Sequence, residues 1–201
     1  MDGTLTEPML DFPRIKAEMG IGNQPILEAL AQMGPVERRI AEAILLRHEE
    51  HAAENSTLNP GCHELIEGAD RQRIRMALIT RNSRVSVKTV LQRHRLCCFD
   101  VLVTREDGAF KPDPYPLRLA CQKLNVGPSQ AWMVGDGQYD VEAGSAAGIA
   151  TVWISHGRPK SFAAEPWQAI RDLPALLELL QEVAADGPPG ASSPHPNPGA
   201  A

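Results

Sequence analysis

The sequence predicts an α/β fold in which a doubly wound parallel sheet carries a small helical cap. From Ile74 onward, short apolar runs alternate with amphipathic helical stretches, which is the pattern of parallel strands covered by helices. Between about Asp11 and Asn55 the spacing is helical throughout, with no strand pattern. A chain of 201 residues with 43% hydrophobic content can bury one substantial core.

Residues 8–58 are predicted to form the cap. Apolar residues recur at helical spacing in two stretches, Ile26, Leu27, Leu30 and Met33, and then Val36, Ile40 and Ile44. Pro35 follows Gly34 and suits the first turn of the second of these helices. Val36, Ile40 and Ile44 are therefore predicted to mark one face of the helix that begins near Pro35.

The turn signal Asn59-Pro60-Gly61 separates the cap from four strand–helix units. The predicted strands are 74–79, 101–103, 131–134 and 150–154, and the predicted helices are 83–95, 114–124, 139–147 and about 174–184. The α/β core is thus assigned to residues 1–7 and 59–184. Residues 185–201 are predicted to be a disordered tail, because GPPGASSPHPNPGAA has too little apolar surface to offset the entropy of ordering.

Composition favours a small soluble substrate over a macromolecular partner. The net charge is −5 with no clustered Lys/Arg stripe, which argues against nucleic acid and against an anionic membrane surface. No stretch approaches the roughly 20 apolar residues of a membrane span. The 4 cysteines form no C-x-x-C pair, so reduced thiols are expected rather than a disulfide framework or a zinc site. A cytoplasmic location is the provisional expectation, and the oligomeric state is left open.

Ligands of such folds bind at the carboxyl ends of the strands, so the residues that follow each apolar run are the candidates for chemistry. Thr80 follows IRMALI, and Arg81 and Asn82 open the next helix, where a hydroxyl and free N–H groups can hold a phosphate. Lys111, in FKPDP, could neutralise an anionic oxygen. Taken alone, Thr80 also fits a helix cap and Lys111 a surface charge.

Two carboxylates follow the third strand. Asp136 comes directly after AWMV, and Asp140 lies four residues further on, in the first turn of a helix. Oxygen ligands of this kind suit Mg²⁺. Asp140 also fits a plain helix N-terminal carboxylate, which the helix dipole favours.

The N-terminal run MDGTLT contains the turn and capping residues that normally follow a buried strand, yet no strand precedes it. In this order, MDGTLT, LITRNS, the lysine of FKPDP and VGDGQYD resemble the four motifs of the haloacid dehalogenase-like hydrolase superfamily. The resemblance runs from Met1 to about Val183. It is closest to the phosphatase branch with a small helical cap, similar to phosphoglycolate phosphatases, whose core is Rossmann-like.

The resemblance implies that the first motif is incomplete. The family motif reads Asp-x-Asp-Gly-Thr after a hydrophobic strand. Its first Asp attacks phosphorus, and its second is the general acid and base. Asp2 matches the second Asp, so the nucleophile would stand immediately before Met1, and the first core strand would precede it. The chain from Met1 onward is therefore expected to be catalytically inactive.

The resemblance also implies roles for the other site residues. Mg²⁺ would be held by the absent Asp, the backbone carbonyl of Asp2, and Asp136. Thr80 and Lys111 would act with Asp2 in catalysis, and Asp140 would orient Lys111 or a metal-bound water. The phosphate-binding group would be Gly3, Thr80, Arg81, Asn82 and Lys111.

The implied reaction is Mg²⁺-dependent hydrolysis of a small phosphorylated metabolite, for example a compact phosphorylated acid such as phosphoglycolate. A carbon–halogen hydrolase would need neither the Asp2 carboxylate nor the metal. Two alternatives stay open. One is a phosphomutase of the same superfamily, and the other is a non-catalytic phosphate-binding or scaffold protein. If the protein is an enzyme, the natural protein is expected to be longer, with Met1 as an internal methionine. If it is the non-catalytic protein, the chain is expected to be truly truncated.

Overall fold

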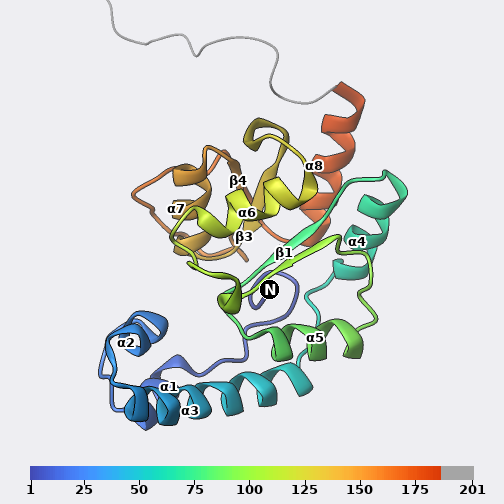
Figure 1. The fold of residues 1–201 in the computed structure, drawn as a ribbon. Helices are drawn as coiled ribbons and strands as arrows, with labels where there is room; N and C mark the ends of the chain where they lie inside the picture. The colour runs from blue at the N-terminus through green and yellow to red at the C-terminus, as the bar shows by residue number, and fades with distance from the viewer. Residues whose placement is uncertain (187–201) are drawn as a thin grey trace, which may run out of the picture.

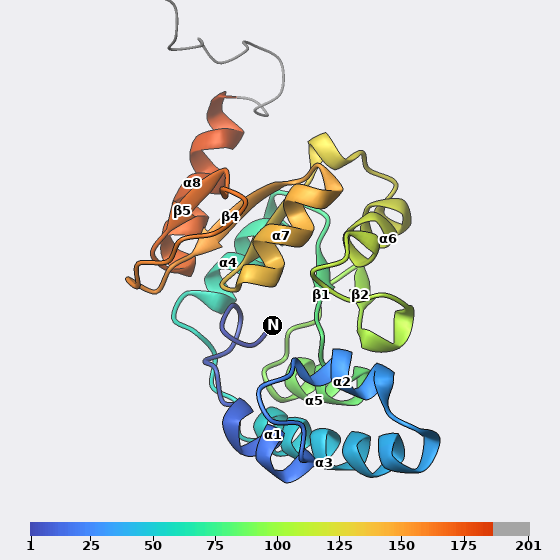
Figure 2. The same ribbon diagram turned by 90° about the vertical axis from the view of Figure 1, so that its left-hand side faces the viewer.

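The computed structural model describes residues 1–186, so the predicted tail falls outside the described residues except at its start. The strands are β1 (Ala77–Ile79), β2 (Val101–Val103), β3 (Trp132–Gly135), β4 (Ala150–Ile154) and β5 (Gln168–Ile170). They form two groups, β1-β2 and β3-β4-β5, and every neighbouring pair is parallel (Figures 1 and 2). The predicted parallel α/β fold is confirmed. β5, a three-residue strand, was not expected.

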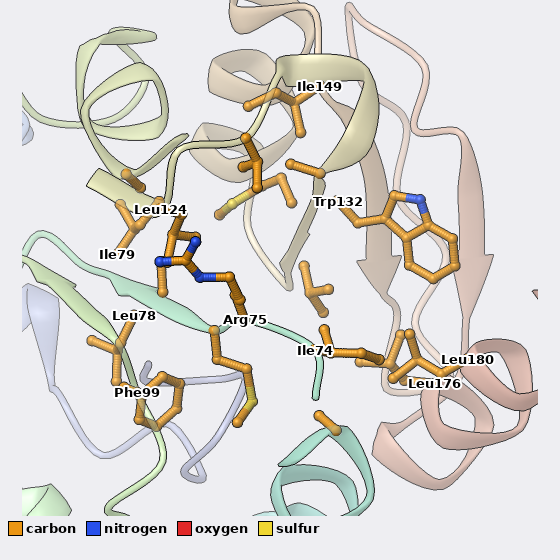
Figure 3. A pocket seen from close by; sticks show the side chains of 18 of the residues that line it. Ile74, Arg75, Leu78, Ile79, Phe99, Leu124, Trp132, Ile149, Leu176 and Leu180 are labelled. Atoms are coloured by element: carbon orange, nitrogen blue, oxygen red, sulfur yellow. The ribbon is translucent and has the colours of Figure 1, made fainter. Parts of the chain in front are cut away.

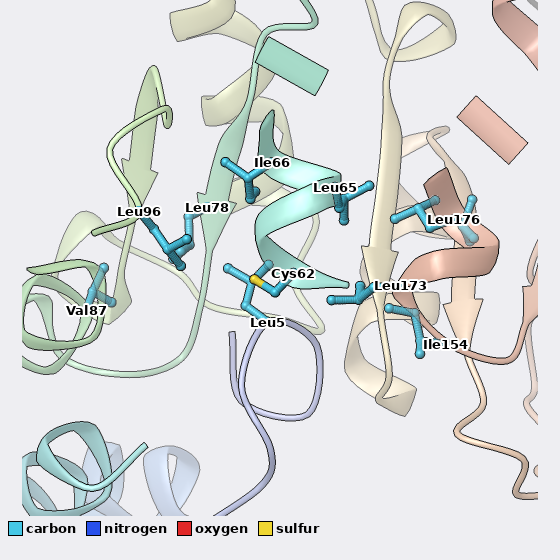
Figure 4. Close-up of a cluster of buried hydrophobic side chains, with 11 residues drawn as sticks. Leu5, Cys62, Leu65, Ile66, Leu78, Val87, Leu96, Ile154, Leu173 and Leu176 are labelled. Atoms are coloured by element: carbon cyan, nitrogen blue, oxygen red, sulfur yellow. The ribbon is translucent and has the colours of Figure 1, made fainter. Parts of the chain in front are cut away.

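Helices cover both faces of the strands. They are α4 (Cys62–Arg71), α5 (Arg84–Arg93), α6 (Tyr115–Leu124), α7 (Gln138–Ala147) and α8 (Leu173–Asp186), with short 3₁₀ turns η1 (Arg105–Asp107) and η2 (Pro128–Gln130). Leu78 of β1 and Ile154 of β4 pack against α4 and α8 (Figure 4). Ile79, the next residue in β1, packs instead against α6, because successive side chains of a strand point to opposite faces. α8 continues through Asp186 and so takes in the first two residues of the predicted tail.

The two strand groups are separated by an apolar cavity of about 690 Å³. β1 lines one side of it and β3 the other, while α4, α6 and α8 supply leucine and isoleucine side chains from both faces (Figure 3). β1 and β3 are not paired to each other, so each ends its own sheet. The core is thus interrupted where a strand between β1 and β3 would lie.

The cap region contains α1 (Phe12–Met19), α2 (Ile26–Gln32) and α3 (Pro35–Glu54), which gather at one end of the molecule (Figure 2). They enclose their own apolar cluster around Ile15, Leu30 and Leu45. α3 packs along α5, which joins the cap to the core.

The predicted apolar face of α3 is not its packed face. Val36 and Ile40 are 69% and 58% exposed. The buried stripe consists of Ala41, Leu45, Glu49 and Ala53. Glu49 lies on this stripe because its carboxylate accepts a hydrogen bond from the Ser83 backbone N–H and pairs with Arg105. Tertiary partners therefore override the simple apolar periodicity in this helix.

Across the described range 1–186, no helix combines the length and the apolarity that a membrane span requires.

Candidate active site

Residues 1–6 form a tight loop at the carboxyl ends of β1 and β3. The carbonyl of Met1 accepts hydrogen bonds from the backbone N–H groups of Thr4 and Leu5, at 3.1 and 2.8 Å. Gly3 has a φ of 74°, in the left-handed region that glycine adopts without strain. The Asn59 side-chain amide donates to the carbonyls of Thr4 and Thr6, at 2.7 and 3.1 Å. The sequence marked Asn59 only as a turn residue, and its anchoring role was missed.

The Asp2 carboxylate is fixed through both of its oxygens. Oδ2 accepts from the Asn82 side-chain amide at 2.6 Å, and Oδ1 accepts from the Thr6 hydroxyl at 3.2 Å. Asn82 follows β1, so the structure brings Asp2 to the predicted end of that strand. The Asn82 backbone N–H donates to the Thr80 hydroxyl oxygen at 3.2 Å, so the hydroxyl can still donate its own hydrogen.

Asp136, after β3, lies against the same loop. Its Oδ1 accepts from the Thr4 hydroxyl at 2.9 Å, and its carbonyl accepts from the Trp153 indole N–H at 3.1 Å. A Cβ placed on Gly3 would overlap the Asp136 carboxylate. The structure therefore brings Asp2 and Gly3 of the first loop together with Asp136, which follows β3.

Gly3→Ala is expected to disturb the site directly. The added methyl group must displace the Asp136 carboxylate, and the left-handed backbone costs a further 1–2 kcal/mol or so for an alanine. We expect a lower thermal midpoint than in the unaltered chain, measured by thermal unfolding. Gly20→Ala is the matched control, since Gly20 also has positive φ but its added Cβ would meet no atom within 4 Å. Equal falls of the thermal midpoint in the two variants would contradict the close packing of Gly3 on Asp136.

Lys111 and Asp140 form a buried ion pair. The Lys111 ammonium donates to Asp140 Oδ1 at 2.6 Å and to the carbonyl of Ile79 at 3.1 Å. The other Asp140 oxygen accepts from the Gly137 backbone N–H at 3.0 Å. Burial alone would raise the pKa of Asp140, but the charge and hydrogen bond of Lys111 hold that pKa below its usual range. The expected orienting role of Asp140 towards Lys111 is consistent with this contact.

The structure turns Arg81 away from the predicted phosphate site. Its guanidinium donates to both carboxylate oxygens of Glu28 in α2, at 3.0 and 2.8 Å, and to the carbonyl of Lys111. Arg81 thus binds the cap rather than the cluster around Asp2. Its predicted neighbours Thr80 and Asn82 do lie at that cluster.

His156 also contacts the first loop and was not predicted. Its Nε2 lies 2.6 Å from the carbonyl of Gly3, so this nitrogen carries the donated hydrogen. His156 follows β4, and the rule that strand ends carry the chemistry could have identified it.

The residues present fit part of a Mg²⁺ site. The available donors are carboxylate and backbone oxygens, which Mg²⁺ prefers. However, within residues 1–186 no three Asp, Glu, His or Cys side chains gather closely enough to hold a metal ion by themselves. One further carboxylate beside Asp136 would be needed to complete such a site.

The family model described as haloacid dehalogenase-like hydrolase matches residues 10–154. A haloacid dehalogenase-like hydrolase domain-containing protein of Arabidopsis thaliana is 32% identical over 165 residues, which is 75% of this chain and 66% of that protein. The plasmid phosphoglycolate phosphatase of Cupriavidus necator is 30% identical over 186 residues, covering 86% of this chain and 80% of the relative. Among solved structures, a hydrolase from Pseudomonas syringae has a TM-score of 0.75 and 19% identity, over 90% of this chain and 95% of that one. The chain therefore belongs to the haloacid dehalogenase-like hydrolases.

Proposed function

We propose that this chain forms most of a Mg²⁺-dependent phosphatase for a small phosphomonoester, completed by a strand and an aspartate that directly precede Met1. The observation that carries this proposal is the apolar cavity between β1 and β3. Met1 lines this cavity, and the loop that begins with Met1 contacts the carboxyl ends of both strands, through Asn82 and Asp136. A strand that ends at Met1 would therefore run parallel to β1 and β3 and fill the space between them.

The surroundings of the Met1 backbone nitrogen support a preceding residue. Burial, followed by the charge of Lys111, lowers the pKa of the Met1 amino group below its usual value. This position is unfavourable for an ammonium group, whereas an uncharged peptide N–H suits it. A residue joined to Met1 would also place its side chain near Asp2, Lys111 and Asp136.

The proposed reaction uses a carboxylate from the residue before Met1 as nucleophile. This carboxylate attacks phosphorus, the bond to the leaving alcohol oxygen breaks, and Asp2 donates a proton to that oxygen. Asp2 then removes a proton from water, which attacks the aspartyl-phosphate and releases inorganic phosphate. Asn82 and Thr6 hold the Asp2 carboxylate in place for both proton transfers.

The other residues stabilise charge on the phosphoryl oxygens. The Lys111 ammonium, fixed by Asp140, and the Thr80 hydroxyl are the donors. Asp136 and the oxygens of the first loop would hold Mg²⁺, which neutralises the repulsion between the attacking carboxylate and the phosphate dianion. The relationship to a phosphoglycolate phosphatase supports a compact phosphorylated acid as substrate.

Asp136→Asn is expected to lower phosphate release by at least about 100-fold in the completed protein, because one metal-binding carboxylate is lost. The measurement is phosphate release from phosphoglycolate and other small esters, with and without Mg²⁺. Asp70→Asn is the control, since Asp70 is exposed at the end of α4, next to the amino end of β1.

Three outcomes would contradict the proposal. They are full activity without Mg²⁺, release of no phosphate from any ester, and conversion of a sugar phosphate to its isomer in place of hydrolysis. The second would favour the non-catalytic phosphate-binding protein, and the third the phosphomutase.

A further inference from the structure

Arg81 lies where three parts of the molecule meet. Its guanidinium is stacked between two aromatic rings, 4.7 Å from the ring centre of Phe110 and 4.4 Å from that of Tyr139. Its Nη2 donates to both carboxylate oxygens of Glu28, and its Nη1 donates to the carbonyl of Lys111. One side chain thus contacts the cap, the loop that carries Lys111, and the first turn of α7.

The two aromatic contacts of Arg81 each adjoin a residue of the candidate site. Phe110 directly precedes Lys111 and also packs against the apolar cluster of the cap. Tyr139 directly precedes Asp140, the partner of the Lys111 ammonium. A shift of the cap relative to the core would therefore be transmitted through Arg81 to both Lys111 and Asp140.

Arginine is the residue type that this position requires. A planar guanidinium can donate from separate nitrogens to two acceptors, here from Nη2 to Glu28 and from Nη1 to the Lys111 carbonyl, and stack on aromatic faces at the same time, whereas the lysine ammonium is a single point charge. The side chains of Arg81 and Glu28 are 20% and 34% exposed, so water screens the pair only in part.

We propose that Arg81 is a positioning residue that couples the docking of the helical cap, through Glu28, to the placement of Lys111. The inference rests on the proposed function only for the catalytic role of Lys111. The coupling itself is a property of the folded chain. Its signature is that a substitution of Glu28, in α2 of the cap, alters amide exchange and lysine labelling in residues 108–113 of the core.

The test measures amide hydrogen exchange and chemical labelling in the full chain. In Glu28→Gln we expect exchange in α2 and at the Asp113 amide, which donates to the Phe110 carbonyl, to be about 3–10 times faster than in the unaltered chain. We also expect Lys111 to be acylated several times faster by an amine-reactive ester, read by mass spectrometry.

Glu42→Gln is the matched control, because Glu42 pairs with Arg38 at 2.7 Å on the exposed surface of α3. It should leave both readouts unchanged. Arg81→Gln and the double variant with Glu28→Gln complete a mutant cycle, and the double variant should exchange no faster at Asp113 than Arg81→Gln alone.

The proposal is overturned if Glu28→Gln speeds exchange in α2 but leaves the exchange of the Asp113 amide and the acylation rate of Lys111 unchanged. The Arg81–Glu28 pair would then only hold the cap. Additive effects in the double variant would overturn it as well. Neither readout requires catalysis, so an inactive completed protein would refute the proposed function and leave this result standing. In an active completed protein, Glu28→Gln should lower kcat more than it raises KM.

Discussion

Joining a strand of about five apolar residues and an aspartate ahead of Met1 is expected to raise stability and phosphate release together. The strand would fill the cavity of about 690 Å³ and pair with the free edges of β1 and β3. Each large apolar side chain that leaves water contributes about 1.5–3 kcal/mol, and ordering each residue costs about 1–2 kcal/mol. Because the aspartate must be ordered as well as the five apolar residues, we expect a net gain of roughly 2 kcal/mol.

For a domain of this size, that gain corresponds to a rise of about 4–8 °C in the thermal midpoint. Thermal unfolding and phosphate release should be measured on the same preparations, with Mg²⁺ present. The decisive control replaces only the added aspartate by asparagine. This variant should keep the stability gain and lose the activity, because the strand is intact while the attacking carboxylate is gone.

Two results would contradict this prediction. The first is phosphate release by the chain from Met1 onward, which would require another nucleophile. The second is an added apolar strand that leaves the thermal midpoint unchanged or lowers it, which would mean that the cavity does not accept a strand. The coding sequence offers an independent check, since an aspartate codon should directly precede Met1, after codons for a run of apolar residues.

Much of the fold could be predicted because its signals are local. β2 and β4 coincide with the predicted strands, since short apolar runs bounded by turn residues are hard to misread. Thr80, Lys111 and Asp136 could be identified as candidates because parallel strands end at the same edge of a sheet. β5 gave no such signal, because its residues Gln168–Ile170 are largely exposed and carry no run of apolar side chains.

Side-chain direction could not be predicted from neighbouring positions. Arg81 stands between Thr80 and Asn82, yet it binds Glu28, 53 residues away in the chain. Similarly, Glu49 lies on the buried face of α3 because its carboxylate accepts a hydrogen bond from the Ser83 backbone N–H and pairs with Arg105 there. In both cases a long-range charged partner decides the orientation, and periodicity carries no information about such partners.

Asp140→Asn is expected to destabilise the chain by about 3–5 kcal/mol at pH 7, because it leaves the Lys111 ammonium buried without a counter-charge. The two side chains are only 8% and 11% exposed, so water can replace little of the lost interaction. The measurement is the free energy of unfolding from denaturant titration. Lys111→Met should also destabilise the chain, since it leaves the Asp140 carboxylate buried without a counter-charge. The double variant should recover much of the loss because no unpaired charge is then buried.

The pH dependence provides a separate test of the same pair. Because Lys111 depresses the folded-state pKa of Asp140, the stabilisation is fully present above the unfolded value of about 3.9 and is lost as the pH falls through the lower folded value. The unaltered chain and Asp140→Asn should therefore differ most near neutral pH, and the difference should shrink below about pH 4. A difference that stays constant down to pH 3 would mean that Asp140 acts through its size and hydrogen bonds alone. In that case Lys111 would have to be held by the Ile79 carbonyl, its other observed acceptor.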